Sequence, residues 1–283
     1  MEDWITGSKI PFGALMNVII SFIKANGRAP LETITGAFKF LIEGLSTVLQ
    51  WPPPLVTILI ITGLAWALHR RIGLAGFVAA ALLFILNQGY WDATMETLAL
   101  VASATLVSVV IGVPLGILAG HRPIVYQVMR PILDIMQTLP TFVYLVPTLV
   151  LFGLGVVPGL ISTVVFALPA PIRMTRLGIV SVPKPLIEAG LAFGATKRQL
   201  LWKVELPSAL ATIMAGINQC IMLSLSMVVI AALVGAGGLG KPVVRALNTV
   251  NIPMGFEAGF AIVLLAIVID RIARADDAKG GGQ

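Results

Sequence analysis

The feature that most constrains this chain is a series of apolar runs separated by short basic or turn-forming segments. Hydrophobic residues make up 58% of the 283 residues and charged residues only 11%, whereas a soluble domain carries about 25% charged residues. Apolar runs of about 20 residues can cross a bilayer as helices. The sequence therefore predicts an all-α integral membrane protein. Because bases between membrane spans explain the net charge of +6, nucleic acid is not an expected partner.

Seven membrane spans are predicted, with prolines, glycines and basic residues between them. A basic connection at 121–131 separates the third span from the fourth, which Pro140 and Pro147 are expected to kink. Gly153–Gly159 is expected to be a tight turn before the fifth span, which should end near residue 172. The other spans are predicted at approximately 55–68, 72–86, 94–119, 132–152, 208–234 and 256–269.

The N-terminal region contains two helical patterns that do not fit the bilayer. Residues 12–23 and 37–50 place apolar side chains at helical spacing, but both are too short or too polar to cross about 30 Å of hydrocarbon. They fit helices that lie in the membrane interface, and equally helices packed against the bundle. The acidic start at residues 1–4 differs from a cleaved signal peptide.

Basic residues are unevenly distributed between the two sides of the predicted spans. Of the 19 Lys and Arg residues, 13 fall on the side of residues 185–207 and the C-terminus, and 6 on the other side. Cytoplasmic loops carry an excess of Lys and Arg. We therefore expect residues 185–207 and the C-terminus in the cytoplasm and the N-terminal segment outside.

Residues 185–207, called the 185–207 loop below, are the longest charged interval between two very apolar ones, and they predict two short helices. Pro185 suits a first helical turn, and Gly194 suits the left-handed position that ends a helix. Thr196 and Gln199 have the spacing of a capping box. The second helix is expected to end at Pro207, which would open the next span. A rigid loop of this kind suits docking against another protein.

The 185–207 loop resembles the EAA signature of ABC-importer permeases, with Gly as the third letter and Val for the usual Ile. The matching residues are Glu188, Ala189, Gly190, Gly194, Val204, Leu206 and Pro207. In that family the loop holds the coupling helix, which sits in a cleft of a cytoplasmic ATPase. The resemblance implies an ATPase-coupling loop that includes Glu188, Ala189, Gly190, Gly194, Ala195, Leu206 and Pro207.

A wider resemblance, to permeases of glycine betaine, proline betaine and choline importers, covers roughly residues 50–270, with matching runs at 134–178 and 188–240. It implies a type I ABC importer transmembrane domain of the MetI-like fold. It also implies a second permease copy, a cytoplasmic ABC ATPase that binds ATP and Mg, and a separate external solute-binding protein. The implied location is the bacterial inner membrane. The runner-up is a permease for methionine or another amino acid.

Four regions are expected along the chain. Residues 1–51 form an external or interfacial amphipathic segment, and residues 52–92 form two accessory transmembrane helices. Residues 93–272 form the permease core, with a coupling loop at 173–207. Residues 273–283 are small and polar, which is typical of a disordered tail.

A few polar side chains within the predicted spans are candidates for a translocation path. Asn218 and Gln219 lie about 15 Å into the sixth span, and Gln137 and Thr138 precede Pro140. Such side chains either bond between helices or line a path, and both interpretations remain open.

Asp134 is expected to pair with Arg130 at helical spacing. His69 and His121 are interpreted as interfacial residues, and Cys220 as a buried small side chain.

The segment Gly235–Pro242 imitates a nucleotide-binding motif. Pro242 replaces the hydroxyl that would hold Mg²⁺, and no strand is predicted before it. A flexible turn after the sixth span is the better interpretation, so we expect no cofactor, no metal and no enzymatic site in this chain. The main rival function is an ion-coupled secondary transporter or channel, which would need ionisable residues at mid-membrane. A membrane enzyme lacks a candidate nucleophile or acid–base pair.

Overall fold

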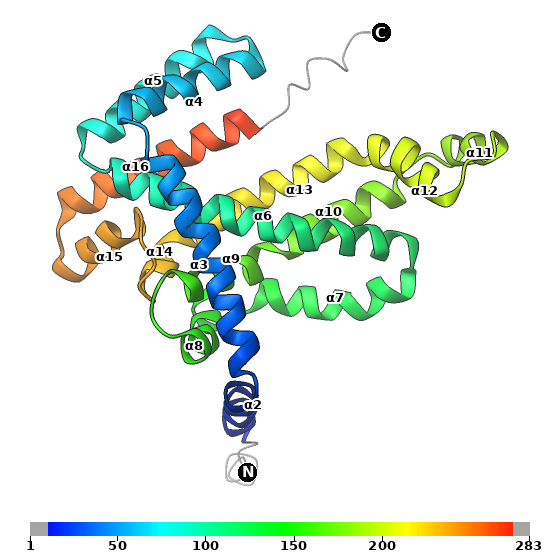
Figure 1. The fold of residues 1–283 in the computed structure, drawn as a ribbon, viewed down its shortest axis with the longest axis horizontal. Coiled ribbons are helices and arrows are strands. Elements are labelled where there is room, and N and C mark those ends of the chain that lie inside the picture. The colour runs from blue at the N-terminus through cyan, green and yellow to red at the C-terminus, as the bar shows by residue number, and fades with distance from the viewer. Residues whose placement is uncertain (1–10, 274–283) are drawn as a thin grey trace, which may run out of the picture.

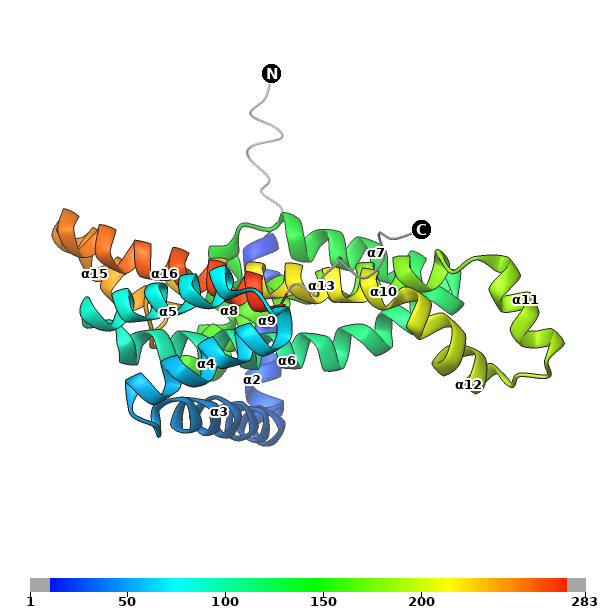
Figure 2. The same cartoon turned by 90° about the horizontal axis from the view of Figure 1, so that it is seen from above.

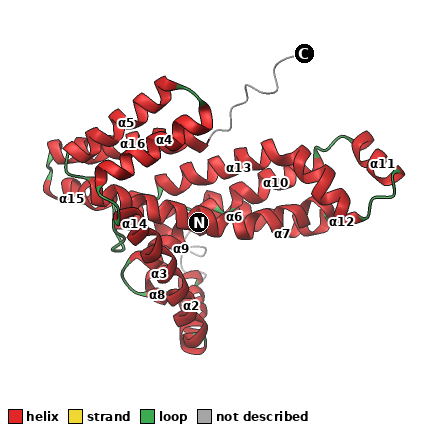
Figure 3. Cartoon of the chain, turned by 45° about the horizontal axis from the view of Figure 1, so that its top comes forward, coloured by secondary structure: helices red, strands yellow, loops and turns green. Residues whose placement is uncertain are grey.

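The computed structural model describes residues 11–273, and residues 1–10 and 274–283 lie outside the description, including the predicted tail. The described part consists of helices and connecting loops, with no strand (Figure 3). The predicted all-α class is therefore confirmed. The helices are α2 (Phe12–Asn26), α3 (Arg28–Gln50), α4 (Pro54–His69), α5 (Ile72–Asn87), α6 (Trp91–His121), α7 (Pro123–Thr138), α8 (Thr141–Phe152), α9 (Val156–Ala167), α10 (Pro169–Val180), α11 (Lys184–Ala192), α12 (Lys197–Leu200), a π-helical turn (Leu201–Glu205), α13 (Leu206–Ser226), α14 (Val228–Ala232), α15 (Gly240–Thr249) and α16 (Ile252–Ala273).

Four helices are long and apolar enough to cross a membrane, namely Trp91–His121, Val156–Val180, Lys197–Ser226 and Ile252–Ala273. Two bent pairs, α3 with α4 and α7 with α8, raise the number to six if each pair is one span. Helix α5 has 16 residues, about 24 Å of helix. The predicted total of seven spans therefore stays a prediction, although the multi-pass membrane architecture is confirmed.

Helices α6, α10 and α13 form the tightly packed centre of the bundle, and they lie side by side in Figures 1 and 2. Small residues allow this approach. A Cβ atom added at Gly116 of α6 would lie 2.6 Å from Thr175 Cβ on α10, and one added at Gly216 of α13 would lie 2.5 Å from Met174 Cβ. Membrane helices pack closely where such residues let backbones meet. The three helices therefore form one closely packed unit.

The predicted start of the fourth span is wrong, whereas the predicted kink at Pro140 is confirmed. The expected basic connection at 121–131 is mostly helix, because α7 begins at Pro123 and continues through Pro131. The fourth span is broken at Pro140, with a bend of 99° between α7 and α8. Pro147, by contrast, lies inside α8.

The predicted end of the fifth span near residue 172 is also wrong, because the candidate span continues through α10 to Val180. Arg173 and Arg176 remain in the helix because each has a partner. Arg173 pairs with Asp134 of α7, and the Arg176 guanidinium lies 3.6 Å from the centre of the Tyr126 ring. Ion pairing and cation–π attraction make a charged side chain tolerable in an apolar helix bundle.

The two N-terminal helices differ in their packing. Helix α3 crosses α6, and Ile42 is buried against Leu100 and Ala104 of α6. Packing against the bundle is therefore the correct alternative for α3. Helix α2 instead exposes Val18 and Phe22, so the interfacial alternative remains a prediction for α2.

The glycine-rich segment after α14 is a packed turn, and the expectation of a flexible one is wrong. The Gly238 N–H donates to Glu96 Oε2 at 2.6 Å, and the Leu239 N–H donates to Thr97 Oγ1 at 2.8 Å. Ala236 is fully buried. The turn leads directly into α15, a helix that the sequence analysis did not predict.

Candidate functional site

The 185–207 loop projects from one end of the bundle, where α11 and α12 extend beyond α10 and α13 (Figure 1). Its first helix, α11, has Pro185 in the first turn. The helix ends where Gly194 adopts φ +77°, and the Ala195 N–H donates to the Gly190 carbonyl at 3.0 Å. This six-to-one bond beside a left-handed glycine is the Schellman motif. The predicted helix end is therefore confirmed.

The second helix begins with the predicted capping box. The Gln199 N–H donates to Thr196 Oγ1 at 3.4 Å, and the Thr196 N–H donates to Gln199 Oε1 at 2.9 Å. Each side chain thus pairs a backbone N–H that a helix start leaves free. The turn between the two helices is fixed on both sides.

Gly190 is the point at which the two helices of the loop meet. A Cβ atom added there would lie 2.8 Å from Leu200 Cδ1 and 3.5 Å from Val204 Cγ2. A side chain at this position would require the Leu200 side chain to move, so Gly190 allows the close approach of the two helices.

The second helix does not end at Pro207, and that prediction is wrong. Residues 197–226 form one continuous helix, within which Leu201–Glu205 widens into a π turn and Leu206 donates to the Leu201 carbonyl. A proline in a regular helix clashes with the carbonyl four residues earlier. We attribute the π turn to this clash, because the extra residue per turn gives Pro207 room.

The tip of the loop exposes apolar side chains. Phe193 is 93% exposed, and Leu191 and Trp202 are also exposed. Glu188 and Ala189 in the same loop are also exposed, whereas Ala195 is half-buried. Exposed aromatic residues beside a charged group are typical of a protein-docking surface.

A buried carboxylate lies at the base of the loop. Glu205 is 6% exposed, and its Oε2 lies 2.8 Å from Nε2 of His121, the last residue of α6. His121 is therefore a partner of Glu205, in addition to lying at a helix end as expected. The sequence analysis missed Glu205 because only the folded chain brings the two residues together. His69, by contrast, is buried, with Nε2 3.2 Å from the Ile272 carbonyl.

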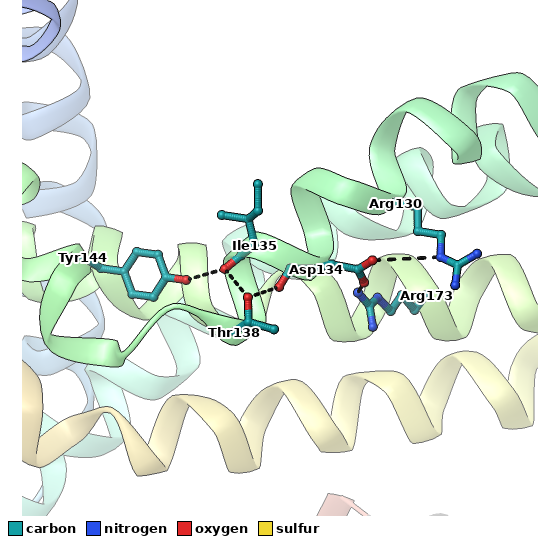
Figure 4. A network of polar contacts seen from close by, with 6 residues as sticks. All are labelled: Arg130, Asp134, Ile135, Thr138, Tyr144 and Arg173. Atoms are coloured by element: carbon teal, nitrogen blue, oxygen red, sulfur yellow. Dashed lines mark hydrogen bonds and ion pairs between the residues drawn. The ribbon is translucent and has the colours of Figure 1, made fainter. Parts of the chain in front are cut away.

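Asp134 lies at the centre of a polar network beside the break between α7 and α8 (Figure 4). The expected pair with Arg130 is present at 3.9 Å, and Asp134 also accepts a short hydrogen bond from Arg173 of α10. Thr138 donates to the Asp134 carbonyl at 2.9 Å. The network therefore joins the broken span to the helix that leads into the 185–207 loop.

Comparison with known proteins identifies the family. Residues 112–279 match the family described as the inner membrane component of binding-protein-dependent transport systems. The glycine betaine transport system permease protein OpuAB of Bacillus subtilis (strain 168) is 46% identical over 266 residues, which are 94% of this chain and 94% of that protein. The glycine betaine/carnitine transport permease protein GbuB of Listeria monocytogenes is 44% identical, over 90% of this chain and 93% of that protein.

The chain belongs to this family. It is a permease subunit of an ABC importer and a multi-pass inner-membrane protein. A solved structure supports the fold of this permease. An inward-facing structure of the MetNI methionine ABC transporter is 28% identical with a TM-score of 0.58, over 66% of this chain and 95% of that one. The MetI-like fold is therefore confirmed.

The candidate path residues of the permease lie in two separate places. Asn218 is half-buried and its Oδ1 has no hydrogen-bond partner among the described residues, whereas Gln219 is exposed. Gln137 is half-buried and Thr138 is exposed on α7. Within the described residues, no hydrogen bond joins the pair on α13 to the pair on α7.

Proposed function

We propose that this permease couples a separate cytoplasmic ATPase to the import of a quaternary ammonium solute such as glycine betaine. The observation that supports the solute class is the 46% identity with OpuAB across 94% of both chains, because that protein is named for glycine betaine transport. A methionine importer is the second candidate, since MetNI shares the fold. At 28% identity and 66% coverage, that likeness is weaker evidence for the solute.

The 185–207 loop is the proposed ATPase-docking surface. Its rigidity supports this role, because a capping box and a Schellman motif fix its two helices. The chain enters the loop from α10 and leaves it through α13, and these helices pack tightly against each other and against α6. A displacement of the loop would therefore move the centre of the bundle as one unit.

The partners and orientation follow from the same proposal. The loop and the C-terminus face the cytoplasm, where the ATPase binds ATP and Mg, and the N-terminal segment lies outside. A second copy of the permease completes the translocation path, and an external binding protein delivers the solute. Within the chain, residues 93–272 form the permease core and residues 52–92 the accessory helices.

The translocation path is proposed to run beside α13. Gln219 is exposed in a single copy although it lies within a membrane-spanning helix. Lipid is an unfavourable environment for an amide, so we assign Gln219 to the path or to the contact with the second copy. Asn218 lies next to it with a free acceptor. Gln137 and Thr138 are the proposed lining on α7.

The test is ATP-driven uptake in proteoliposomes that contain the permease, its ATPase and its binding protein, with labelled glycine betaine and methionine as solutes. Gly194→Arg should abolish uptake while the protein remains in the membrane, because a side chain at φ +77° strains the turn and distorts the docking surface. Gly44→Arg, at an open position on α3, is the charge-matched control. Normal uptake by Gly194→Arg would contradict the docking role, and uptake of methionine alone would contradict the solute class.

A further inference from the structure

His121 and Glu205 form a contact between α6 and the long helix that contains α13. These two helices are not consecutive in the chain at this end of the bundle. His121 ends α6, and Glu205 ends the π turn that links the 185–207 loop to α13. Their side chains meet at 2.8 Å. An ionised carboxylate only accepts hydrogen bonds, so with Glu205 ionised Nε2 of His121 donates.

The two side chains of this contact differ in burial, and the hydrogen bond between them depends on its geometry. The Glu205 side chain is 8% exposed and the His121 side chain 43% exposed, so the acid lies inside and the imidazole closes it from the rim. Deeper in the bundle, an apolar cluster around Ile179, Ala209 and Ile213 joins the same helices. Apolar contacts are non-directional, whereas a hydrogen bond is sensitive to distance and angle. The pair therefore adds a directional contact to the apolar ones, which include Leu201 and Leu206 at the two ends of the π turn.

The π turn is a segment that such a contact can stabilise. It interrupts the regular hydrogen bonding between the loop and α13, and π turns of this kind are frequent at functional sites. A helix that widens at one turn has a point at which it can bend. Glu205 lies at this point, and its bond to His121 ties the turn to a third helix.

We propose that His121 and Glu205 are positioning residues that hold the 185–207 loop at a fixed angle to α6. Movement of the loop then reaches α6 directly, in addition to α10 and α13. In this role the pair acts through the loop. This inference rests on the proposed function, because it assumes that the loop receives the movement of an ATPase.

The first test measures the angle of the loop without any transport. The only cysteine of the chain, Cys220, is replaced by serine, and spin labels are placed at Phe193→Cys on the tip of the loop and Arg122→Cys beside the end of α6. In the purified full-length chain, the distance distribution should broaden in His121→Ala and in Glu205→Leu. It should stay narrow in Glu32→Gln, which removes an exposed ion pair on α3. An unchanged distribution in both variants would overturn the proposal.

The second test measures solute imported per ATP hydrolysed by the reconstituted transporter. His121→Ala should lower this ratio by about fivefold or more, the range of ordinary coupling effects. The amount of bound ATPase should stay at the wild-type level. The exchange His121→Glu with Glu205→His should restore most of the ratio, because it restores a hydrogen-bonded pair.

The outcomes separate the two proposals. A wild-type ratio in His121→Ala would overturn the role of the pair and leave the proposed function intact. Loss of the wild-type uptake itself would contradict the proposed function, and the spin-label distances would still decide the role of the pair. A fall in protein yield or unfolding temperature without a change in the ratio would assign the pair to stability alone and would also overturn the proposal.

Discussion

The Tyr144 hydroxyl donates a hydrogen bond to the backbone carbonyl of Met136, across the break at Pro140. In a continuous helix the N–H of residue 140 would bond to that carbonyl, but proline has none. The Tyr144 hydroxyl replaces the missing donor, so the carbonyl keeps a hydrogen-bond partner. Tyr144 thus stabilises the bend that joins α7 to α8.

Tyr144→Phe should destabilise the permease, because it leaves the Met136 carbonyl unpaired. A buried polar group without a partner costs about 1–3 kcal/mol. The measurement is thermal unfolding of the purified chain in detergent. Tyr126→Phe is the matched control, since the face of the Tyr126 ring contacts Arg176 and this contact needs no hydroxyl. Equal unfolding temperatures for the Tyr144 variant and the wild type would contradict this role.

Asp134 should be coupled more strongly to Arg173 than to Arg130. The Arg173 contact is a short hydrogen bond between helices, whereas the Arg130 contact is 3.9 Å long within α7. Double-mutant cycles with Asp134→Asn should give a coupling energy of about 0.5–1 kcal/mol for Arg173→Gln. The same cycle with Arg130→Gln should give a value near zero, and the reverse order would refute the assignment.

Gly116→Val should prevent tight packing of α6 against α10. Any Cβ at this position would lie 2.6 Å from Thr175 Cβ and 2.7 Å from the Ile172 carbonyl oxygen, and neither can move without the backbone. Overpacking of this kind costs about 1–3 kcal/mol or more. Gly76→Ala in α5, where nothing lies within 4 Å, is the control and should be neutral or slightly stabilising. The unfolding temperatures of the two variants and the wild type provide the comparison.

Stability should fall at alkaline pH in a way that depends on Tyr90. Burial raises the pKa of the Tyr90 hydroxyl, and the Glu257 carboxylate at 3.3 Å raises this pKa further. The folded-state pKa is then above the unfolded value of about 10. The stabilising contribution is fully present below the unfolded pKa and is lost as pH rises through the folded pKa. Tyr90→Phe should reduce the loss of unfolding temperature between about pH 9 and 11, and an identical pH profile would argue against this effect.

Local signals in the sequence were enough to predict the internal structure of the 185–207 loop. The capping box at Thr196 and the helix end at Gly194 depend on residues three to five positions apart, so the sequence contains all of their chemistry. The membrane class can be predicted equally well, because the hydropathy of each apolar run is a local property of the sequence.

Long-range partners explain the predictions that failed. Arg173 resembles the start of a loop until Asp134, 39 residues earlier, is known to lie beside it. The glycine-rich turn resembles a flexible segment until Glu96 and Thr97 of α6 are seen to bind it. Glu205 gave no signal, because its partner His121 is 84 residues away.

Photo-crosslinking from Phe193 tests the central claim most directly. A photoreactive label on Phe193→Cys, in the Cys220→Ser background, should capture the ATPase in membranes that contain the assembled importer. The same label on Phe256→Cys, which is exposed at the start of α16, should not. Capture of the ATPase from position 256, with none from position 193, would contradict the assignment of the 185–207 loop as the site that receives the movement of the ATPase.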